Sequence, residues 1–275
     1  IYDAINKILI KNNIIAPQLV SQNYLKNYIE VQDLGAKTIY QLLNNRNTNK
    51  YLTFVKILKV LRDIQLIKDK KIRNFKKKNY QIKEYKNNIL FNETKLFCDW
   101  YVPKKLSKKK YVLFNSKFKK EIRYLLSKLN YKNDTFVHRD FHVSNLIVNL
   151  DRKIGVIDSQ DALIGNKAYD LASLIDDVRF KTSISLKNKV YNHYVNSNKK
   201  INEKKFKNDF EILSVLRNLK IIGIFTRLAL RDNKAKYLKL IPYAWEMINF
   251  RMKQNKVFVN LNFLLKDNFR SILGK

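Results

Sequence analysis

The stretch from Thr135 to Asp158, TFVHRDFHVSNLIVNLDRKIGVID, constrains this chain more than any other part of its sequence. A His-Arg-Asp triplet is followed, after four residues, by Asn145, and then by two short apolar runs at 146–148 and 154–157 that flank a charged turn. Such runs on either side of turn-forming residues are typical of a β-hairpin. A hairpin here would bring the asparagine and the final aspartate to the same end.

Three oxygen-bearing side chains in this stretch suit the transfer of a phosphoryl group. That reaction depends mainly on positioning the acceptor hydroxyl and on neutralising charge with Mg²⁺. Asp140 fits the carboxylate that faces the hydroxyl. Asn145 and Asp158 fit two metal ligands, because Mg²⁺ prefers oxygen donors and takes its other ligands from phosphate and water. The triplet alone would indicate an exposed charged turn, but that alternative does not explain the whole constellation.

The motifs of this region resemble those of known kinases. The spacing from His138 to Asn145 is similar to the catalytic loop of protein kinases, in which a metal-binding aspartate follows a hairpin. HRDFHVSNLIV, GVIDSQDALIG and YDLASLI resemble the aminoglycoside phosphotransferase and choline kinase superfamily. HRDFHVSNL, IDSQDALIGNKAYDL and KIIGIFTRLALRDNKAKYL are similar to motifs of the cell-wall-recycling kinases that act on the anomeric hydroxyl of N-acetylmuramate and N-acetylglucosamine. The resemblance extends from the first helix to about residue 250.

The resemblance implies an α+β, protein-kinase-like bilobal fold with a large, mostly helical C-lobe, and an enzyme that uses ATP and Mg²⁺ to phosphorylate a small molecule. An amino sugar is the expected acceptor, and another small-molecule kinase of the aminoglycoside phosphotransferase or choline kinase type is the alternative. It implies Asp140 as the catalytic base or hydroxyl-orienting group and Asn145 and Asp158 as Mg²⁺ ligands. Asp170 would be a structural partner of the loop. His142 matches a histidine common in small-molecule kinases, where it would contact substrate or be a hydrogen-bonded loop residue.

The segment after Asp158 predicts further support for the loop. Gly165 is expected to permit a tight turn, and Asp170 to open a helix. An aspartate at a helix start is first of all a cap, and here it would also brace the catalytic loop, for instance by bonding His138. Asp161 is expected to be exposed and is a candidate for contact with a substrate hydroxyl.

The first 35 residues predict a helix, an extended segment, and a strand within YIEVQDLG that ends in a turn at Gly35. In a kinase this strand would be the last of the small lobe, and backbone groups near Glu30, Val31 and Gln32 would meet adenine. A plain strand end is equally consistent with these residues. We therefore expect a remnant of the N-lobe and the hinge in residues 1–35 and the C-lobe in 36–275, as one phosphotransferase domain.

One departure from the family pattern concerns the phosphate-binding elements. None of the five glycines precedes Gly35, so no Gly-rich loop is visible. Lys7 and Lys11 belong to the opening helix, which leaves no strand lysine to bind phosphates. We expect that the upstream half of the N-lobe is truncated from this sequence. The alternative is a catalytically silent kinase-like binding module, against which the intact Asp140 and metal-ligand pair argue.

The rest of the chain is expected to be mainly helical. An apolar stripe at helical spacing predicts a helix at 51–67, whereas 68–88 is polar and basic and is expected to be a surface connection. Asn92 is expected to cap a helix that begins near Glu93, and Ser116 to cap the next one. Residues 186–274 are expected to be helical.

Composition narrows the classes of function. The net charge of +33 invites a nucleic-acid interpretation, but the lysines are spread along the chain and accompany abundant Asn, Ile and Tyr, so no dedicated nucleic-acid partner is expected. No run of about 18 apolar residues is present, so no membrane span is expected. A single cysteine, Cys98, excludes an internal disulfide and favours the cytoplasm. The partners expected are ATP and a small-molecule acceptor.

Overall fold

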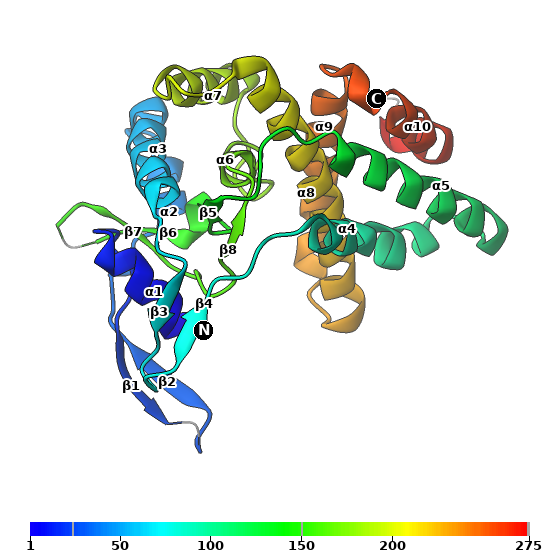
Figure 1. Cartoon of the computed structure of the whole chain (residues 1–275). Coiled ribbons are helices and arrows are strands. Elements are labelled where there is room, and N and C mark those ends of the chain that lie inside the picture. Colours follow the sequence, from blue (N-terminus) through cyan, green and yellow to red (C-terminus); the bar gives the residue numbers. More distant parts are fainter. Residues whose placement is uncertain (24, 150, 274–275) are drawn as a thin grey trace. The chain divides into compact units, whose positions relative to one another are not determined.

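The structure is a computed structural model that describes residues 1–23, 25–149 and 151–273, and it comprises two compact units (Figure 1). The first unit is formed by Ile1–Tyr85, Lys132–Ile175 and Thr182–Ile201. The second is formed by Lys86–Tyr131, Asp176–Lys181 and Asn202–Lys275. All the predicted catalytic-loop and hinge residues belong to the first unit.

The first unit combines helices with short strands. Its elements, in chain order, are α1 (Tyr2–Lys11), β1 (Leu19–Asn23), β2 (Tyr28–Val31), α2 (Ile39–Asn44), α3 (Lys50–Leu66), β3 (Lys71–Arg73), β4 (Asn79–Gln81), β5 (Thr135–Val137), the 3₁₀ turn η3 (Val143–Asn145), β6 (Leu146–Val148), β7 (Ile154–Val156), β8 (Leu163–Gly165), α6 (Ala168–Ile175) and α7 (Ile184–Asn196).

Each strand of the described residues pairs with one antiparallel neighbour, giving the pairs β1–β2, β3–β4, β5–β8 and β6–β7. The β6–β7 hairpin is the one predicted from the two apolar runs, with Leu146 opposite Val156. An added Cβ on Gly155 would lie 3.1 Å from side-chain atoms of both Ile15 and Leu34. This close approach packs the two N-terminal segments onto the hairpin, which places the predicted hinge beside the catalytic loop.

The predicted opening helix is confirmed as α1. Its apolar side chains at Ile5, Ile8 and Leu9 are fully buried, as the helical spacing predicts. Helix α3 likewise coincides with the helix expected at 51–67. Both helices therefore bury an apolar face, and in α1 polar contacts add to it, because the buried Asp3 carboxylate accepts a hydrogen bond from the backbone N–H of Phe75 at 2.7 Å.

The expected surface connection at 68–88 is wrong in its centre, where the chain forms the β3–β4 hairpin. The turn is stabilised by the side chain of Asn74, which accepts hydrogen bonds from the backbone N–H groups of Lys76 and Lys78. Past the hairpin, Ile82 and Tyr85 are buried. The abundance of lysine hid the alternation in these strands, each of which has only three residues.

Four local predictions also fail. The helix expected near Glu93 begins earlier, as α4 (Asn87–Leu96), so Asn92 lies inside it. Ser116 lies inside α5 (Lys108–Ser127), whose N-cap is Ser107. Gly165 is not in a turn but ends β8, opposite Thr135. Helix α6 begins at Ala168, so Asp170 is in its first turn and does not open it.

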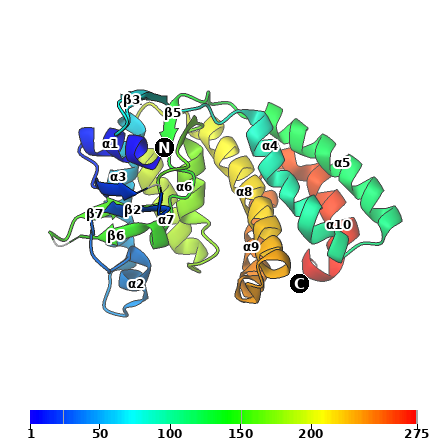
Figure 2. The ribbon, with the colours of Figure 1, turned by 90° about the horizontal axis from the view of Figure 1, so that it is seen from below.

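Every element of the second unit within its described residues is helical. Its elements are α4, the π-helical turn η1 (Phe97–Tyr101), η2 (Val102–Lys104), α5, α8 (Glu203–Arg231), η4 (Ala235–Leu240), α9 (Ile241–Met252), η5 (Lys256–Phe258) and α10 (Val259–Leu273). The helical character expected for 186–274 is confirmed up to residue 273. Figure 2 shows α8 running between α4 and α9 within this unit.

Aromatic side chains fill the core of the second unit. Phe97 is fully buried and its ring lies 5.5–5.8 Å from those of Phe118, Trp245 and Phe269, distances typical of favourable aromatic pairs. Gly223 of α8 allows the close helix packing that builds this core, because an added Cβ would lie only 2.3 Å from the Leu96 carbonyl carbon. Across the described residues, every helix is too short or too polar to cross a bilayer.

Candidate active site

The catalytic loop starts from a buried strand and is held by Asp170. Strand β5 is buried along its length and pairs with β8. From α6, the two carboxylate oxygens of Asp170 accept hydrogen bonds from the backbone N–H groups of His138 (2.7 Å) and Arg139 (3.0 Å). Arg139 has a φ of 75°, a left-handed conformation that is unusual for a residue other than glycine. Asp170 therefore fixes the strained start of the loop through backbone amides, and not through the histidine ring.

His138 links this loop to the segment that carries Asp158. The ring is fully buried, and its Nε2 lies 3.0 Å from the carbonyl oxygen of Ile157. Because a carbonyl only accepts, Nε2 carries the proton and donates. Burial lowers the pKa of His138, and this effect outweighs the negative charge of Asp140, which raises the pKa. The ring is thus a neutral structural donor.

Asn145 brings the other two predicted residues together. Its Nδ2 donates to the carbonyl oxygen of Asp140 at 3.1 Å and lies 3.4 Å from Oδ2 of Asp158. The backbone N–H of Ile157 donates to the carbonyl oxygen of Asn145 at 3.0 Å. The hairpin therefore does what the sequence predicts and delivers Asn145 and Asp158 to one end.

The donor chemistry at this end fits a magnesium ion. With Nδ2 of Asn145 engaged by Asp140, the Oδ1 atom accepts no hydrogen bond from any described residue, and the Asp158 carboxylate is exposed. No group of three or more His, Cys, Asp or Glu residues within the described part of the chain is arranged to hold a metal by itself. An ion bound here would need ligands from phosphate and water, as Mg²⁺ characteristically does.

A pocket of about 530 Å³ opens onto these two residues. Its volume is within the range typical of small-molecule sites. One part of the wall is apolar and the other carries oxygen and amide groups. The pocket is lined by Tyr2, Pro17, Val31, Gln32, Asp33, Leu34, Asn145, Ile147, Ile157, Asp158 and Gln160.

The predicted hinge residues have different places around this pocket. Val31 and Gln32 line it, whereas Glu30 does not, and the Glu30 carboxylate instead accepts a hydrogen bond from the Ser21 hydroxyl on the neighbouring strand. The backbone N–H of Gln32 donates a hydrogen bond to the carbonyl oxygen of Gln18 at 2.8 Å. Leu34 follows, and its backbone N–H makes no hydrogen bond to another described residue.

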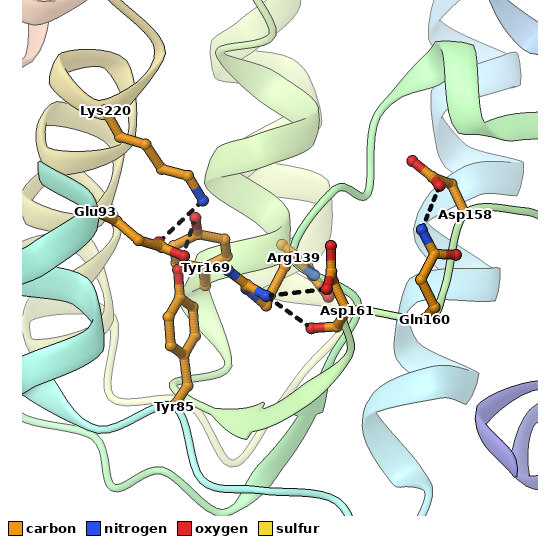
Figure 3. Close-up of polar contacts among 9 residues, drawn as sticks. Tyr85, Glu93, Arg139, Asp158, Gln160, Asp161, Tyr169 and Lys220 are labelled. Carbon is orange, nitrogen blue, oxygen red and sulfur yellow. Dashed lines mark hydrogen bonds and ion pairs between the residues drawn. The ribbon is translucent and has the colours of Figure 1, made fainter. Parts of the chain in front are cut away.

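Among the pocket residues that were not anticipated from the sequence, Gln160 and Tyr2 interact with Asp158. Gln160 donates from Nε2 to Oδ1 of Asp158 at 2.7 Å (Figure 3). Tyr2 of α1 also lines the pocket, and burial, with a smaller contribution from the Asp158 charge, raises the pKa of its phenol. The position of Gln160 two residues after Asp158 was the available signal for it. Nothing in the sequence placed Tyr2 there.

The remaining predicted residues lie on the loop or beside it. His142 is buried, its N–H donates to the carbonyl oxygen of Asp140, and its own carbonyl accepts from Asn145. Asp161 is exposed, and its backbone carbonyl oxygen accepts a hydrogen bond from Arg139 at 3.1 Å (Figure 3). The Arg139 guanidinium lies 5.1 Å from the centre of the Tyr85 ring, within cation–π range.

This geometry agrees with what is found when the chain is compared with known families. A model described as the phosphotransferase enzyme family matches residues 10–196. The chain belongs to this family. The matched range contains the predicted catalytic loop, the β6–β7 hairpin, the predicted hinge segment and α6.

Two curated relatives carry the same name. The chain is 32% identical over 184 residues to an N-acetylmuramate/N-acetylglucosamine kinase of Neisseria meningitidis, covering 65% of this chain and 54% of the relative. It is 25% identical over 258 residues to an enzyme of that name from Pseudomonas aeruginosa, covering 90% of this chain and 72% of the relative. The chain thus spans about half the length of the Neisseria protein.

Solved structures show the fold. A choline/ethanolamine kinase family protein from Mesorhizobium loti superposes with a TM-score of 0.63 at 9% identity, covering 94% of this chain and 80% of that one. At this identity the similarity concerns the fold alone. It confirms the predicted α+β, protein-kinase-like fold class.

Proposed function

We propose that this protein is an ATP- and Mg²⁺-dependent kinase that phosphorylates a hydroxyl group of an amino sugar. The observation that carries the proposal is a single pocket whose wall contains the hinge segment together with Asn145 and Asp158. The loop that presents Asp140 is bonded to the same asparagine. Membership in the phosphotransferase enzyme family supports the reaction class.

The nucleotide would occupy the pocket with its base at the apolar side. Val31, Leu34 and Ile147 offer a surface for adenine, and the unused backbone N–H of Leu34 offers a donor for a ring nitrogen. The phosphates would then point to the polar side, where Asn145 and Asp158 lie. In this proposal residues 1–35 supply the hinge side of the nucleotide site and residues 36–275 form the C-lobe, including the catalytic loop.

The reaction would be assisted by three side chains of the first unit. Asp140 would accept a hydrogen bond from the acceptor hydroxyl, orient its oxygen toward the terminal phosphorus and take up the proton. Asn145 Oδ1 and the Asp158 carboxylate would hold Mg²⁺, which when bound neutralises charge on the phosphate oxygens. His138 and Asp170 would keep the loop in the conformation that presents Asp140. Because positioning and charge stabilisation dominate phosphoryl transfer, these roles are the part of the chemistry that the described residues would supply.

The acceptor class is inferred from the relatives. Those from Neisseria and Pseudomonas are both named for N-acetylmuramate and N-acetylglucosamine. Asp161, which is exposed close to Arg139, would contact a sugar hydroxyl. His142 would either contact the acceptor or have a structural role. Its backbone hydrogen bonds to Asp140 and Asn145 stabilise the turn of the loop.

The test is an acceptor panel. The protein is incubated with ATP and Mg²⁺ and with N-acetylmuramate, N-acetylglucosamine, choline or kanamycin, and phosphorylated products are detected by mass spectrometry. We expect product with the amino sugars and none without Mg²⁺. Turnover of choline alone would refute the acceptor class. Nucleotide binding that is indifferent to Mg²⁺, with no product from any acceptor, would instead establish a non-catalytic binding module.

A further inference from the structure

Asn6 of α1 and Ser159 form a buried polar contact beside Asp158. The Ser159 hydroxyl donates to Oδ1 of Asn6, and both side chains are almost completely buried, with exposures of 0% and 1%. The Nδ2 atom of Asn6 donates to the carbonyl oxygen of Pro17 at 2.8 Å. The carboxamide of Asn6 therefore joins α1, the segment before β1 and the residue that follows Asp158.

A buried polar contact lowers the stability of the fold unless every polar atom in it finds a hydrogen-bond partner. A buried amide or hydroxyl loses its hydration on folding and must recover hydrogen bonds inside the protein. An apolar pair at these positions would avoid that cost, so core packing alone does not account for a serine and an asparagine here. The polar pair adds a directional contact, because a hydrogen bond between two buried side chains fixes their orientation relative to each other.

The backbone conformation at Asp158 is one that a directional contact nearby can help to maintain. Asp158 has a φ of 61°, in the left-handed region that a residue without glycine's freedom seldom occupies. A strained residue of this kind persists only where its surroundings determine it strongly. On one side, the backbone of Ile157 is bonded to Asn145, and on the other, the carbonyl oxygen of Ser159 accepts from Ala162 at 3.0 Å. The Ser159 side chain supplies a further anchor, and it leads to α1.

We propose that Asn6 and Ser159 are positioning residues that hold the Asp158 segment in the conformation that binds a magnesium nucleotide. The inference rests on the proposed function, because it assumes that Asp158 binds the metal. It assigns α1 a role in the reaction: the helix that contributes Tyr2 to the pocket wall also fixes the carboxylate opposite. Neither residue lines the pocket that contains Asn145 and Asp158.

The central experiment measures ADP binding by calorimetry with Mg²⁺ and with EDTA. Ser159→Ala removes only the hydroxyl oxygen, and we expect it to weaken Mg²⁺·ADP binding about 3- to 10-fold, which corresponds to one buried hydrogen bond. Binding of ADP in EDTA should change less than about 2-fold, since the metal ligand is then idle. Ser173→Ala is the matched control, because Ser173 is a fully buried serine of α6 whose hydroxyl has no hydrogen-bond partner among the described residues.

A double-mutant cycle and hydrogen exchange complete the test. In an Asn6→Ala background, Ser159→Ala should have no further effect on Mg²⁺·ADP binding, because the contact is already lost. Amide exchange over residues 157–162 should accelerate in Ser159→Ala and not in Ser173→Ala, whether or not ligand is present. Thermal unfolding shows that each variant is folded.

The outcomes separate the two claims. Unchanged Mg²⁺·ADP binding in Ser159→Ala, or additive effects in the cycle, overturns the positioning role while leaving the proposed function intact. A wild-type protein that binds ADP equally with and without Mg²⁺ overturns the proposed function. In that case the amide exchange of residues 157–162 still tests whether Ser159 anchors this segment. An exchange rate in Ser159→Ala equal to that of the wild type refutes the anchor.

Discussion

The contact between Asp170 and the catalytic loop gives a sharp test of how the loop is held. Asp170→Asn keeps the size of the side chain but turns an NH₂ group toward one of the two backbone N–H donors at His138 and Arg139. One charge-assisted hydrogen bond is lost, one becomes neutral, and one buried N–H is left without an acceptor. Taken together, these changes should lower the free energy of unfolding by about 2–4 kcal/mol.

This loss is less than the total stability of about 5–15 kcal/mol that is usual for folded proteins, so the variant should remain folded. Urea denaturation followed by circular dichroism measures the loss. Hydrogen exchange locates it, because the amides of His138 and Arg139 should lose protection while the amides of α3 keep theirs. We expect phosphoryl transfer to fall by at least about 10²-fold, as the strained loop that presents Asp140 relaxes.

Asp209 offers a matched control in the second unit. Its buried carboxylate also accepts hydrogen bonds from two backbone N–H groups, those of Asn130 and Tyr131, each at 2.8 Å to one of its oxygens. The carboxylate also accepts from the side-chain amides of Asn130 and Asn208, so Asp209→Asn should cost at least as much stability but leave phosphoryl transfer unchanged. Equal losses of activity in the two variants would show that reduced stability, and not loop geometry, explains the effect of Asp170→Asn.

Three further predictions concern the protein's stability and reactivity. Burial lowers the pKa of His138, so the unfolded chain takes up a proton below about pH 6.5 while the folded protein resists it. In urea denaturation, the contribution of His138 to the free energy of unfolding should be complete above about pH 6.5 and should be lost as the pH falls below it. If His138→Gln left the dependence of this free energy on pH unchanged, the prediction would be contradicted. Burial raises the pKa of the Cys98 thiol, so mass spectrometry should detect no iodoacetamide adduct on the native protein and one adduct after denaturation; rapid native alkylation would be inconsistent with the core. Gly223→Ala places a Cβ 2.3 Å from the Leu96 backbone and should destabilise the protein by about 3 kcal/mol, a cost that a thermal melt would reveal and that a stabilised variant would refute.

The sequence was most informative where chemistry and periodicity agreed. The β6–β7 hairpin was predictable because its two apolar runs bracket a charged turn, and Asn145 and Asp158 then had to share one end. The helices α1 and α3 were predictable from their apolar faces. These features depend on residues that are near one another in the chain.

Elements governed by distant contacts were not predictable. Gly165 looked like a turn residue, but in the structure it ends β8, where an added Cβ would crowd Val137 at 3.1 Å and Tyr85 at 3.2 Å. The β3–β4 hairpin was hidden by its lysines. Tyr2 and Asn6 reach the Asp158 segment only because α1 folds back onto it, a contact across about 150 residues that no local pattern records.

The central claim is that Asp140 directs phosphoryl transfer from a loop bonded to Asn145, which lines the pocket together with Asp158. The most direct measurement is the rate of phosphate transfer from ATP to N-acetylmuramate by the wild type, by Asp140→Asn and by Asp151→Asn, a control carboxylate exposed in the β6–β7 turn. We expect Asp140→Asn to lose about 10²- to 10³-fold in kcat with an unchanged unfolding curve, and Asp151→Asn to match the wild type. Normal turnover by Asp140→Asn would contradict the proposed mechanism.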